Sequence, residues 1–569
     1  MWLKRLAVVL FGLLAVAGCS EDRREAMVAT ADGRASEVAR DILVAGGSAV
    51  DAAIAAQMVL GLVEPQSSGI GGGAFLLNWD AATRTIDAYD GRETAPAEAR
   101  PDLFLDETGK PLDFMEAVVG GRSVGVPGVI AMLWQAHQDH GRLAWAELFK
   151  PAIRMAREGF VISGRLAEAI AEARPLLQNP AARAYLFMTD MSVPDGALPL
   201  PAGAVIRNEA YARTLERIAE KGPAGFYEGP VADAIVEAVR DNPNPGSMTL
   251  ADLAAYRPIK REAVCGPYRH FRICGMPAPS SGGLTTLMIL GMLEHFRMDE
   301  LRPDGVMANH LLAEASALAF ADRDRYMADP DHVAVPSAGM IDRQYLAERA
   351  RLIDPGKAMG RAEPGMPPGA PLRAEGLDRA RAGTSHLSIV DGDGNAVSMT
   401  TTIEGPFGAH IMAAGFFLNN ELTDFSFMPT GADGTPVANA VAPGKRPRSS
   451  MAPTLVFDGN RELVGVVGSP GGSRIIGYVT QTLLGLIDWK MTMQEAIDLP
   501  RVLDRNGPIE LEERRPVVRL APALEEMGHK VSIRPSISGL QGIWRRGDRL
   551  EGGADRRREG VVLGATAAR

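Results

Sequence analysis

Thr384 is the residue whose type and position point most directly to nucleophilic chemistry. It begins a regular pattern that predicts a strand, a tight turn at Asp391–Gly394 and a second strand. Counting back from the turn places Thr384 opposite roughly Thr401, so the hydroxyl of Thr400 or Thr402 can lie beside its own. A threonine hydroxyl is a weak nucleophile at neutral pH and needs a base within hydrogen-bonding reach.

A linker-like segment precedes this threonine. Residues 351–383 are rich in Gly, Pro, Arg and Ala and show no sustained periodicity, which predicts a flexible surface linker. A nucleophile directly after such a linker suits autocatalytic cleavage between Gly383 and Thr384. Cleavage would expose an α-amino group, whose pKa in a free chain is about 7.7–8.0. Base and nucleophile would then belong to the same residue.

The N-terminus predicts export. Two basic residues precede an apolar run from Leu6 to Ala17, which favours a secretory signal over residues 1–18 rather than a membrane span. The run ends in Val16-Ala17-Gly18-Cys19, which resembles a bacterial lipobox with Cys19 as the lipidated first residue of the mature protein. A plain signal peptide that contains a cysteine is the alternative. Because no aspartate follows Cys19, we expect a periplasmic protein anchored to the outer membrane.

Composition excludes several classes of function. The 569-residue chain has a net charge of −10 and no basic patch with interleaved aromatic residues, so we expect no nucleic-acid partner. Its nine histidines form no HExxH motif and its three cysteines form no CxxC motif. The nearest approach to a metal cluster, His137-Gln-Asp-His140, is interpreted as a solvated helix end. We therefore expect neither a metal nor an organic cofactor.

Two further cysteines flank a predicted hairpin. The segment Val264–Cys274 is expected to turn near Arg269 and His270, which places Cys265 opposite Cys274. Export favours a cross-strand disulfide between them. Two reduced, buried cysteines are the alternative.

Six motifs resemble those of the γ-glutamyltranspeptidase family and occur in the family's order. They are Asp90-Gly-Arg-Glu-Thr-Ala-Pro96, Pro279-Ser-Ser-Gly-Gly283, the segment from Thr384 to Val397, Asn419-Asn-Glu-Leu-Thr-Asp-Phe425, Lys445-Arg-Pro-Arg-Ser-Ser-Met451 and Gly468-Ser-Pro-Gly-Gly472. The resemblance implies an α+β fold, the four-layer αββα sandwich of N-terminal-nucleophile hydrolases. It also implies a large subunit (19–383) and a small subunit (384–569) that remain associated after cleavage.

The resemblance also implies the catalytic roles. Thr402 corresponds to the hydroxyl that orients the nucleophile, and Gly471 and Gly472 present backbone N–H groups to the oxyanion. The expected reaction forms a γ-glutamyl ester on Thr384 from glutathione or another γ-glutamyl amide. Water, an amino acid or a peptide then accepts the acyl group.

A γ-glutamyl group carries an α-carboxylate and an α-ammonium, so its pocket should contain both charges. The resemblance assigns the carboxylate to Arg92, helped by Ser449 and Ser450. It assigns the ammonium to three acidic residues, Glu404, Glu421 and Asp424, although some relatives carry asparagine in place of Glu404.

One departure from the family pattern concerns the pocket lid. Residues 426–439 form a shorter segment than in many bacterial relatives and contain no tyrosine, and Phe427 lies near the start of the segment. A more open pocket would admit bulkier acyl donors. This keeps a glutaryl or cephalosporin-type acylase of the same fold as an alternative, with a non-catalytic periplasmic binding lipoprotein as a third hypothesis.

Overall fold

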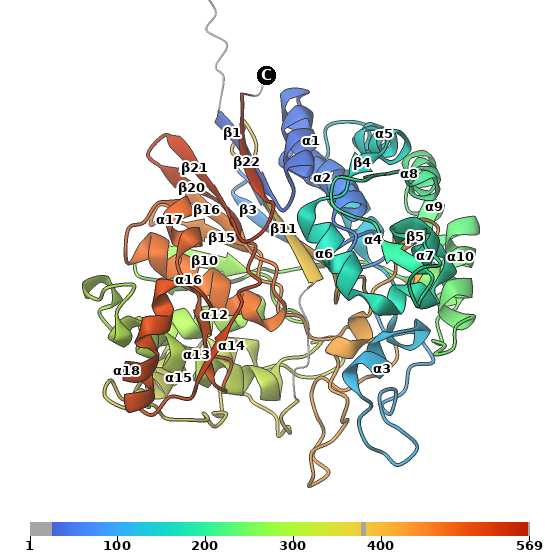
Figure 1. The fold of residues 1–569 in the computed structure, drawn as a ribbon. Coiled ribbons are helices and arrows are strands. Elements are labelled where there is room, and N and C mark those ends of the chain that lie inside the picture. Colours follow the sequence, from blue (N-terminus) through green and yellow to red (C-terminus); the bar gives the residue numbers. More distant parts are fainter. Residues whose placement is uncertain (1–24, 377–382, 567–569) are drawn as a thin grey trace, which may run out of the picture.

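Two stacked β-sheets form the centre of the molecule, in a computed structural model that describes residues 25–376 and 383–566 (Figure 1). The seven-stranded sheet has the order β22-β1-β11-β12-β2-β3-β8. Its strands are β1 (Glu25–Thr30), β2 (Gly73–Asp80), β3 (Thr85–Gly91), β8 (Ile259–Arg261), β11 (Gly383–Val390), β12 (Ala396–Glu404) and β22 (Val561–Thr566). The six-stranded sheet has the order β21-β20-β16-β15-β10-β9. Its strands are β9 (Val264–Tyr268), β10 (Phe271–Gly275), β15 (Thr454–Phe457), β16 (Leu463–Gly468), β20 (Gln541–Arg546) and β21 (Arg549–Ala554).

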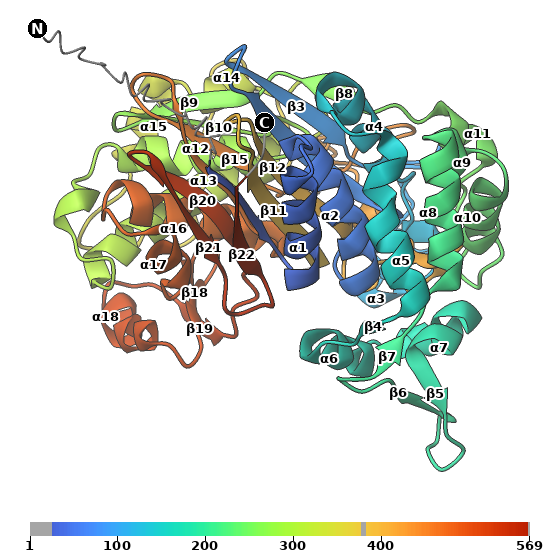
Figure 2. The ribbon, with the colours of Figure 1, turned by 90° about the horizontal axis from the view of Figure 1, so that it is seen from above.

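Helices cover the outer face of each sheet (Figure 2). The seven-stranded sheet packs against a helical layer that includes α1 (Gly33–Val44), α2 (Ala49–Val63), α4 (Val129–His140), α5 (Lys150–Glu158) and α8 (Glu209–Lys221). The six-stranded sheet packs against α12 (Gly282–Leu293), α16 (Ile475–Ile487) and α17 (Met493–Asp498), and α13 (Val306–Tyr326) packs on α12. The expected αββα arrangement of layers is therefore confirmed.

The side chains of the inner strands point alternately to two faces, which explains how one sheet contributes to two hydrophobic cores. In β1, Ala26 and Val28 belong to the core beneath α1 and α2, whereas Met27 and Ala29 belong to the core shared with the second sheet. Side chains of a strand point alternately to its two faces. A strand that is apolar at every position can therefore form two cores at once, as an internal layer requires.

The smaller elements lie around this sandwich. The remaining helices include α3 (Phe114–Val118), α6 (Gly164–Glu172), α7 (Pro180–Leu186), α9 (Ala224–Tyr227), α10 (Pro230–Arg240), α11 (Leu250–Ala255), α14 (Ser337–Met340), α15 (Arg343–Ala350) and α18 (Ala521–Glu526). A three-stranded sheet of β17 (Val502–Leu503), β18 (Ile509–Glu512) and β19 (Val531–Arg534) packs with α18.

The hairpin that begins at Thr384 is confirmed as β11 and β12, with one change of register. Thr384 pairs directly with Thr402, not with Thr401. The difference arises at the turn, because Val390 pairs with Ala396 and leaves Asn395 outside the ladder. Cross-strand partners project from the same face, so the hydroxyls of Thr384 and Thr402 lie side by side.

The cysteine hairpin has the expected register. Cys265 in β9 pairs with Cys274 in β10, and the two are joined by a disulfide.

The predicted linker contains no helix or strand between residues 354 and 376 apart from isolated bridges. Residues 377–382, the signal segment and Cys19 lie outside the described residues. Within the described ranges, none of the helices has both the length and the apolar character that a membrane span requires.

Candidate active site

One pocket brings together nearly all the residues that the sequence nominated. Its lining consists of Arg92, Thr384, Thr402, Glu404, Glu421, Asp424, Ser449, Ser450, Met451, Gly472 and Ile475. Two nominated residues are not part of the lining, and each directly precedes one that is: Gly383 precedes Thr384, and Gly471 precedes Gly472. The free volume is about 20 Å³, which is room for about one water molecule. The side chains that line the pocket therefore fill much of it.

Thr402 connects the proposed nucleophile to the peptide bond before it. The Thr402 hydroxyl donates a hydrogen bond to the carbonyl oxygen of Gly383 at 2.6 Å. Its oxygen accepts from the backbone N–H of Glu404 at 2.8 Å and lies 3.2 Å from the Thr384 hydroxyl. A hydroxyl has one hydrogen, so the Thr384 hydroxyl must be the donor in its contact with Thr402. Thr402 therefore both polarises the Gly383 carbonyl and orients the oxygen that could attack it.

Buried polar contacts hold the start of β11 in place. The Thr384 carbonyl accepts from Arg558 at 2.9 Å, and the Ser385 hydroxyl donates to Glu64 at 2.7 Å. Burial raises the pKa of Glu64, and the guanidinium of Arg165 opposes that rise. Arg558 and Glu64 were not nominated from the sequence, since neither lies in a motif near Thr384.

Gly471 and Gly472 form a turn that leads into α16. Their φ values are 139° and 61°, in the region that favours glycine. A Cβ on Gly471 would lie 2.6 Å from the ring of Tyr478, so no larger residue fits. The short 3₁₀ turn Gly472–Arg474 continues directly into α16. Backbone N–H groups at such a helix start are unpaired within the helix and suit an anion.

Arg92 lies at the centre of a buried charge cluster. Its guanidinium pairs with Glu421 and, at 2.5 Å, with Asp424, and it also donates to the carbonyls of Pro447 and Arg448. The Glu93 carboxylate is 3.8 Å from it. Arg92 is fully buried, and the surrounding carboxylates raise its pKa above its ordinary value despite that burial.

The carboxylates around Arg92 outnumber it. Burial raises the pKa of Glu421 to about 7, although Arg92 opposes the rise. Burial and the neighbouring Glu421 carboxylate also raise the pKa of Glu93 well above its ordinary value. The Glu93 and Glu421 carboxyl groups are close enough to share a hydrogen bond with each other. The cluster therefore contains more acidic groups than its one guanidinium can neutralise.

The remaining nominated residues are fixed by neighbours. The Ser450 oxygen accepts from Arg323 at 2.6 Å, and the Ser449 oxygen accepts from the backbone N–H of Met451 at 3.1 Å. Glu404 has a left-handed backbone (φ 73°), and its carboxylate accepts from Asn420 at 2.5 Å. Arg323 and Asn420, like Glu93, were missed by the sequence analysis. Of these three residues, Glu93 could most easily have been nominated from the sequence, since it directly follows Arg92.

The short lid leaves the pocket without an aromatic cover. Phe427 is buried and stacks on Phe104 at 4.6 Å between ring centroids, within a separate apolar cluster. It does not line the pocket. The one aromatic residue of this segment, Phe427, therefore does not cover the glutamyl site.

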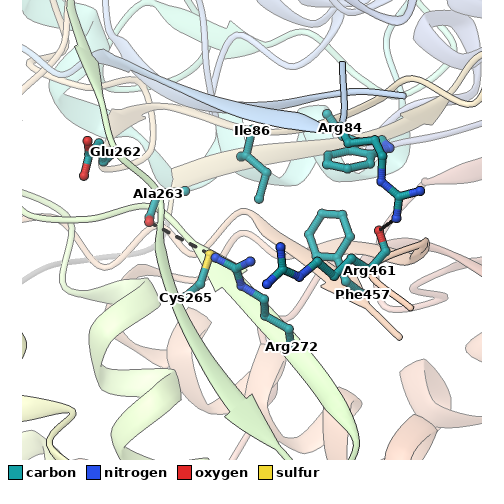
Figure 3. Close-up of a pocket in the computed structure, with 9 residues that line it drawn as sticks. Arg84, Ile86, Glu262, Ala263, Cys265, Arg272, Phe457 and Arg461 are labelled. Carbon is teal, nitrogen blue, oxygen red and sulfur yellow. Dashed lines mark hydrogen bonds between the residues drawn. The ribbon is translucent and has the colours of Figure 1, made fainter. Parts of the chain in front are cut away.

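A second pocket, at the opposite end of the sheets, contains no candidate nucleophile. It has a volume of about 440 Å³ and includes Trp79, Cys265 and Phe457 in its lining, with three exposed arginines at its rim (Figure 3). Trp79 pairs with Ala396, whereas Gly73 at the other end of β2 pairs with Thr402. The length of β2 therefore separates this pocket from Thr384.

Comparisons with known proteins show similarity along nearly the whole chain. The family profile described as gamma-glutamyltranspeptidase matches residues 35–565. The glutathione hydrolase proenzyme of Bacillus subtilis (strain 168) is 37% identical over 96% of this chain and 92% of its own length. The Acylase ACY 1 proenzyme of Pseudomonas sp. (strain V22) is also 37% identical, over 90% of this chain and 88% of its own. The crystal structure of cephalosporin acylase from Bacillus halodurans superposes with a TM-score of 0.82 at 30% identity, covering 95% of this chain and 96% of that one.

Proposed function

The chain belongs to the γ-glutamyltranspeptidase family, and we propose that it cleaves itself between Gly383 and Thr384 and then acts on γ-glutamyl amides such as glutathione. The observation that carries the proposal is the bond from the Thr402 hydroxyl to the Gly383 carbonyl, with the Thr384 hydroxyl beside it. The Thr384 hydroxyl that could attack and the Thr402 hydroxyl that could stabilise the oxyanion therefore lie beside the same peptide bond.

The first stage is an N-to-O acyl shift. The Thr384 Oγ attacks the Gly383 carbonyl carbon, and the developing oxyanion is stabilised by the Thr402 hydroxyl. The C–N bond then breaks, the proton lost by the Thr384 hydroxyl is transferred to the Thr384 nitrogen, and an ester remains on Oγ. Water hydrolyses this ester and leaves a Gly383 carboxylate and a free Thr384 amine.

The second stage uses the same oxygen on a substrate. The Thr384 α-amine accepts the hydroxyl proton as Oγ attacks the γ-carbonyl carbon. The N–H groups of Gly471 and Gly472 stabilise the oxyanion, and the amine product leaves with a proton from the Thr384 ammonium. Water, or the amine of an amino acid or peptide, releases the glutamyl group in the reverse sequence.

Charge in the pocket favours γ-glutamyl over glutaryl groups. An α-carboxylate would replace one of the carboxylates now paired with Arg92, and an α-ammonium would neutralise the displaced Glu421 or Asp424 together with Glu404. A glutaryl group has no ammonium. It would leave these buried carboxylates unpaired, which is costly. The uncovered pocket and the similarity to acylases make the glutaryl reaction the competing hypothesis.

Hydrolysis of matched anilides separates the two functions. We expect the self-cleaved protein to release aniline from a γ-glutamyl anilide with a kcat/KM at least about tenfold above that for the glutaryl anilide, a free-energy difference of ~1.4 kcal/mol. The Thr384→Ala variant should stay uncleaved and inactive on both. A preference for the glutaryl anilide would establish the acylase function instead.

We also propose that Cys19 carries a lipid anchor in the periplasm. The apolar run and the Val16-Ala17-Gly18-Cys19 sequence support this. β1 begins at Glu25, and its N-terminal end lies beside Val390, at the end of β11 remote from Thr384. Six strand residues separate these ends by about 20 Å, so the active site would lie away from the anchored end. Retention of wild type, but not Cys19→Ala, in the membrane fraction is the expected result.

A further inference from the structure

A buried cluster of two histidines and a glutamate lies outside the active site. His310 and Glu314 are one turn apart on α13, and His529 follows α18, which packs against α13 (Figure 1). The ligand atoms of these three residues all lie within 4.8 Å of one another, and each residue is at most 9% exposed. His310 is 13 residues before Arg323, which bonds Ser450 in the active site, so about 20 Å of helix separates the two sites.

Hydrogen bonds fix which nitrogen of His310 is available. Its Nε2 lies 2.8 Å from the carbonyl oxygen of Asp354, which can only accept, so Nε2 carries the hydrogen. Its Nδ1 therefore presents a lone pair toward the Nε2 of His529, 2.7 Å away. A backbone carbonyl that holds one imidazole N–H and directs the other nitrogen at a ligand is the arrangement found around metal-bound histidines.

The cluster contains a buried carboxylate without a compensating cation. Glu314 accepts one hydrogen bond, from the Met359 N–H at 3.1 Å, and its other oxygen lies 3.9 Å from the Nδ1 of His529. Among the described residues no lysine or arginine pairs with it. A second buried carboxylate, Asp504, is close enough for the two charges to repel. An isolated buried carboxylate is costly unless it is paired, takes up a proton or binds a metal.

We propose that His310, Glu314 and His529 bind a divalent transition-metal ion, with zinc as the best match. Two imidazole nitrogens and one carboxylate oxygen form a common donor set for zinc. Nitrogens that bind one tetrahedral ion at about 2.0–2.1 Å lie roughly 3.3 Å apart. The two rings must therefore separate by roughly half an ångström, and His529 must carry its hydrogen on Nδ1.

The position of the cluster gives the ion a structural role. His310 and Glu314 belong to the proposed large subunit, and His529 to the small subunit. After cleavage at Thr384 the ion would link the two chains where no peptide bond connects them. This role rests on the proposed cleavage, but the metal site itself does not, because all three ligands are present in the uncleaved chain.

A second acidic cluster provides a matched control. Asp87, Asp139 and His140 also lie within ligand distance of one another. There, however, the Lys260 ammonium already pairs with Asp87 at 3.0 Å and Asp139 at 3.2 Å. A resident cation removes the electrostatic reason for a metal, so His140→Asn should leave metal binding unchanged.

The test is metal binding by the purified full-length protein and its variants. We expect one zinc per molecule after dialysis against zinc, and visible d–d absorption when Co²⁺ replaces it. Glu314→Gln and His529→Asn should each weaken zinc binding by more than about 100-fold, whereas His140→Asn should not. In the cleaved protein, chelation should lower the urea concentration at which the two chains separate.

Three results would overturn the proposal. One is wild-type protein that binds less than a stoichiometric amount of zinc and gives no cobalt spectrum. The contact between His310 and His529 would then be a neutral N–H···N hydrogen bond without a metal. Another is equal binding by wild type and the His529→Asn variant. The third is loss of zinc only in His140→Asn. Wild-type protein alone decides the first result, so misfolding of a variant cannot obscure it.

Discussion

Replacing Thr402 by valine tests how the uncleaved chain activates its own peptide bond. Valine keeps the shape of threonine but removes the hydroxyl that donates to the Gly383 carbonyl and accepts from Thr384. Loss of one donor to a developing oxyanion typically lowers a rate by about 10²–10³, or roughly 3–4 kcal/mol. The backbone N–H of Glu404 also loses its acceptor, which should destabilise the fold by about 1–3 kcal/mol.

The assay is the rate at which purified precursor converts to two chains on a denaturing gel. We expect Thr402→Val to process on the order of 10²–10³ times more slowly than wild type, and Thr402→Ser to remain within about tenfold. Thr401→Val is the matched control, because the Thr401 hydroxyl is buried without a partner, and it should process at the wild-type rate. Processing of Thr402→Val within about threefold of wild type would refute the role assigned to Thr402.

Three further predictions concern the mature enzyme. Arg92→Lys keeps the charge but loses the fork, so KM for a γ-glutamyl anilide should rise by roughly 10- to 100-fold with a smaller change in kcat; a changed kcat alone would contradict this. Because burial raises the pKa of Glu421 to about 7, this carboxyl is protonated below that pH, so KM should rise as pH falls below 7. In Glu421→Gln that pH dependence should disappear, and its persistence would assign the titration elsewhere. Gly471→Ala places a Cβ 2.6 Å from the Tyr478 ring at φ 139°, so kcat should fall by about 10²-fold or more while circular dichroism stays native; unchanged turnover would exclude this turn as the oxyanion site.

The hairpin at the active site could be predicted from local sequence because its determinants are local. Asp391–Gly394 specify the turn, and the alternation on either side specifies the strands. The register was one residue in error, because the backbone N–H of Asp391 bonds the carbonyl of Asn395 and draws that residue into the turn. Such a shift depends on turn hydrogen bonds that composition does not determine.

The charge balance of the pocket could not be predicted in the same way. The sequence nominated Arg92, Glu421 and Asp424 as binding groups, but it did not indicate that they pair with one another before substrate arrives. That pairing depends on the fold, which brings the end of β3 to a segment more than 300 residues later. The metal cluster illustrates the same limit. The spacing of His310 and Glu314 is visible in the sequence, but the position of His529 beside them is set by how α18 packs.

Intact-mass measurement of the denatured protein tests the central claim most directly. The account predicts two chains in wild type, the smaller beginning at Thr384, and a single uncut chain in Thr384→Ala. Brief treatment with a γ-glutamyl anilide before acid quenching should add the mass of one glutamyl group to the smaller chain. A folded wild-type protein that remains one chain, or that carries the glutamyl group on another residue, would contradict the assignment of Thr384 as the nucleophile.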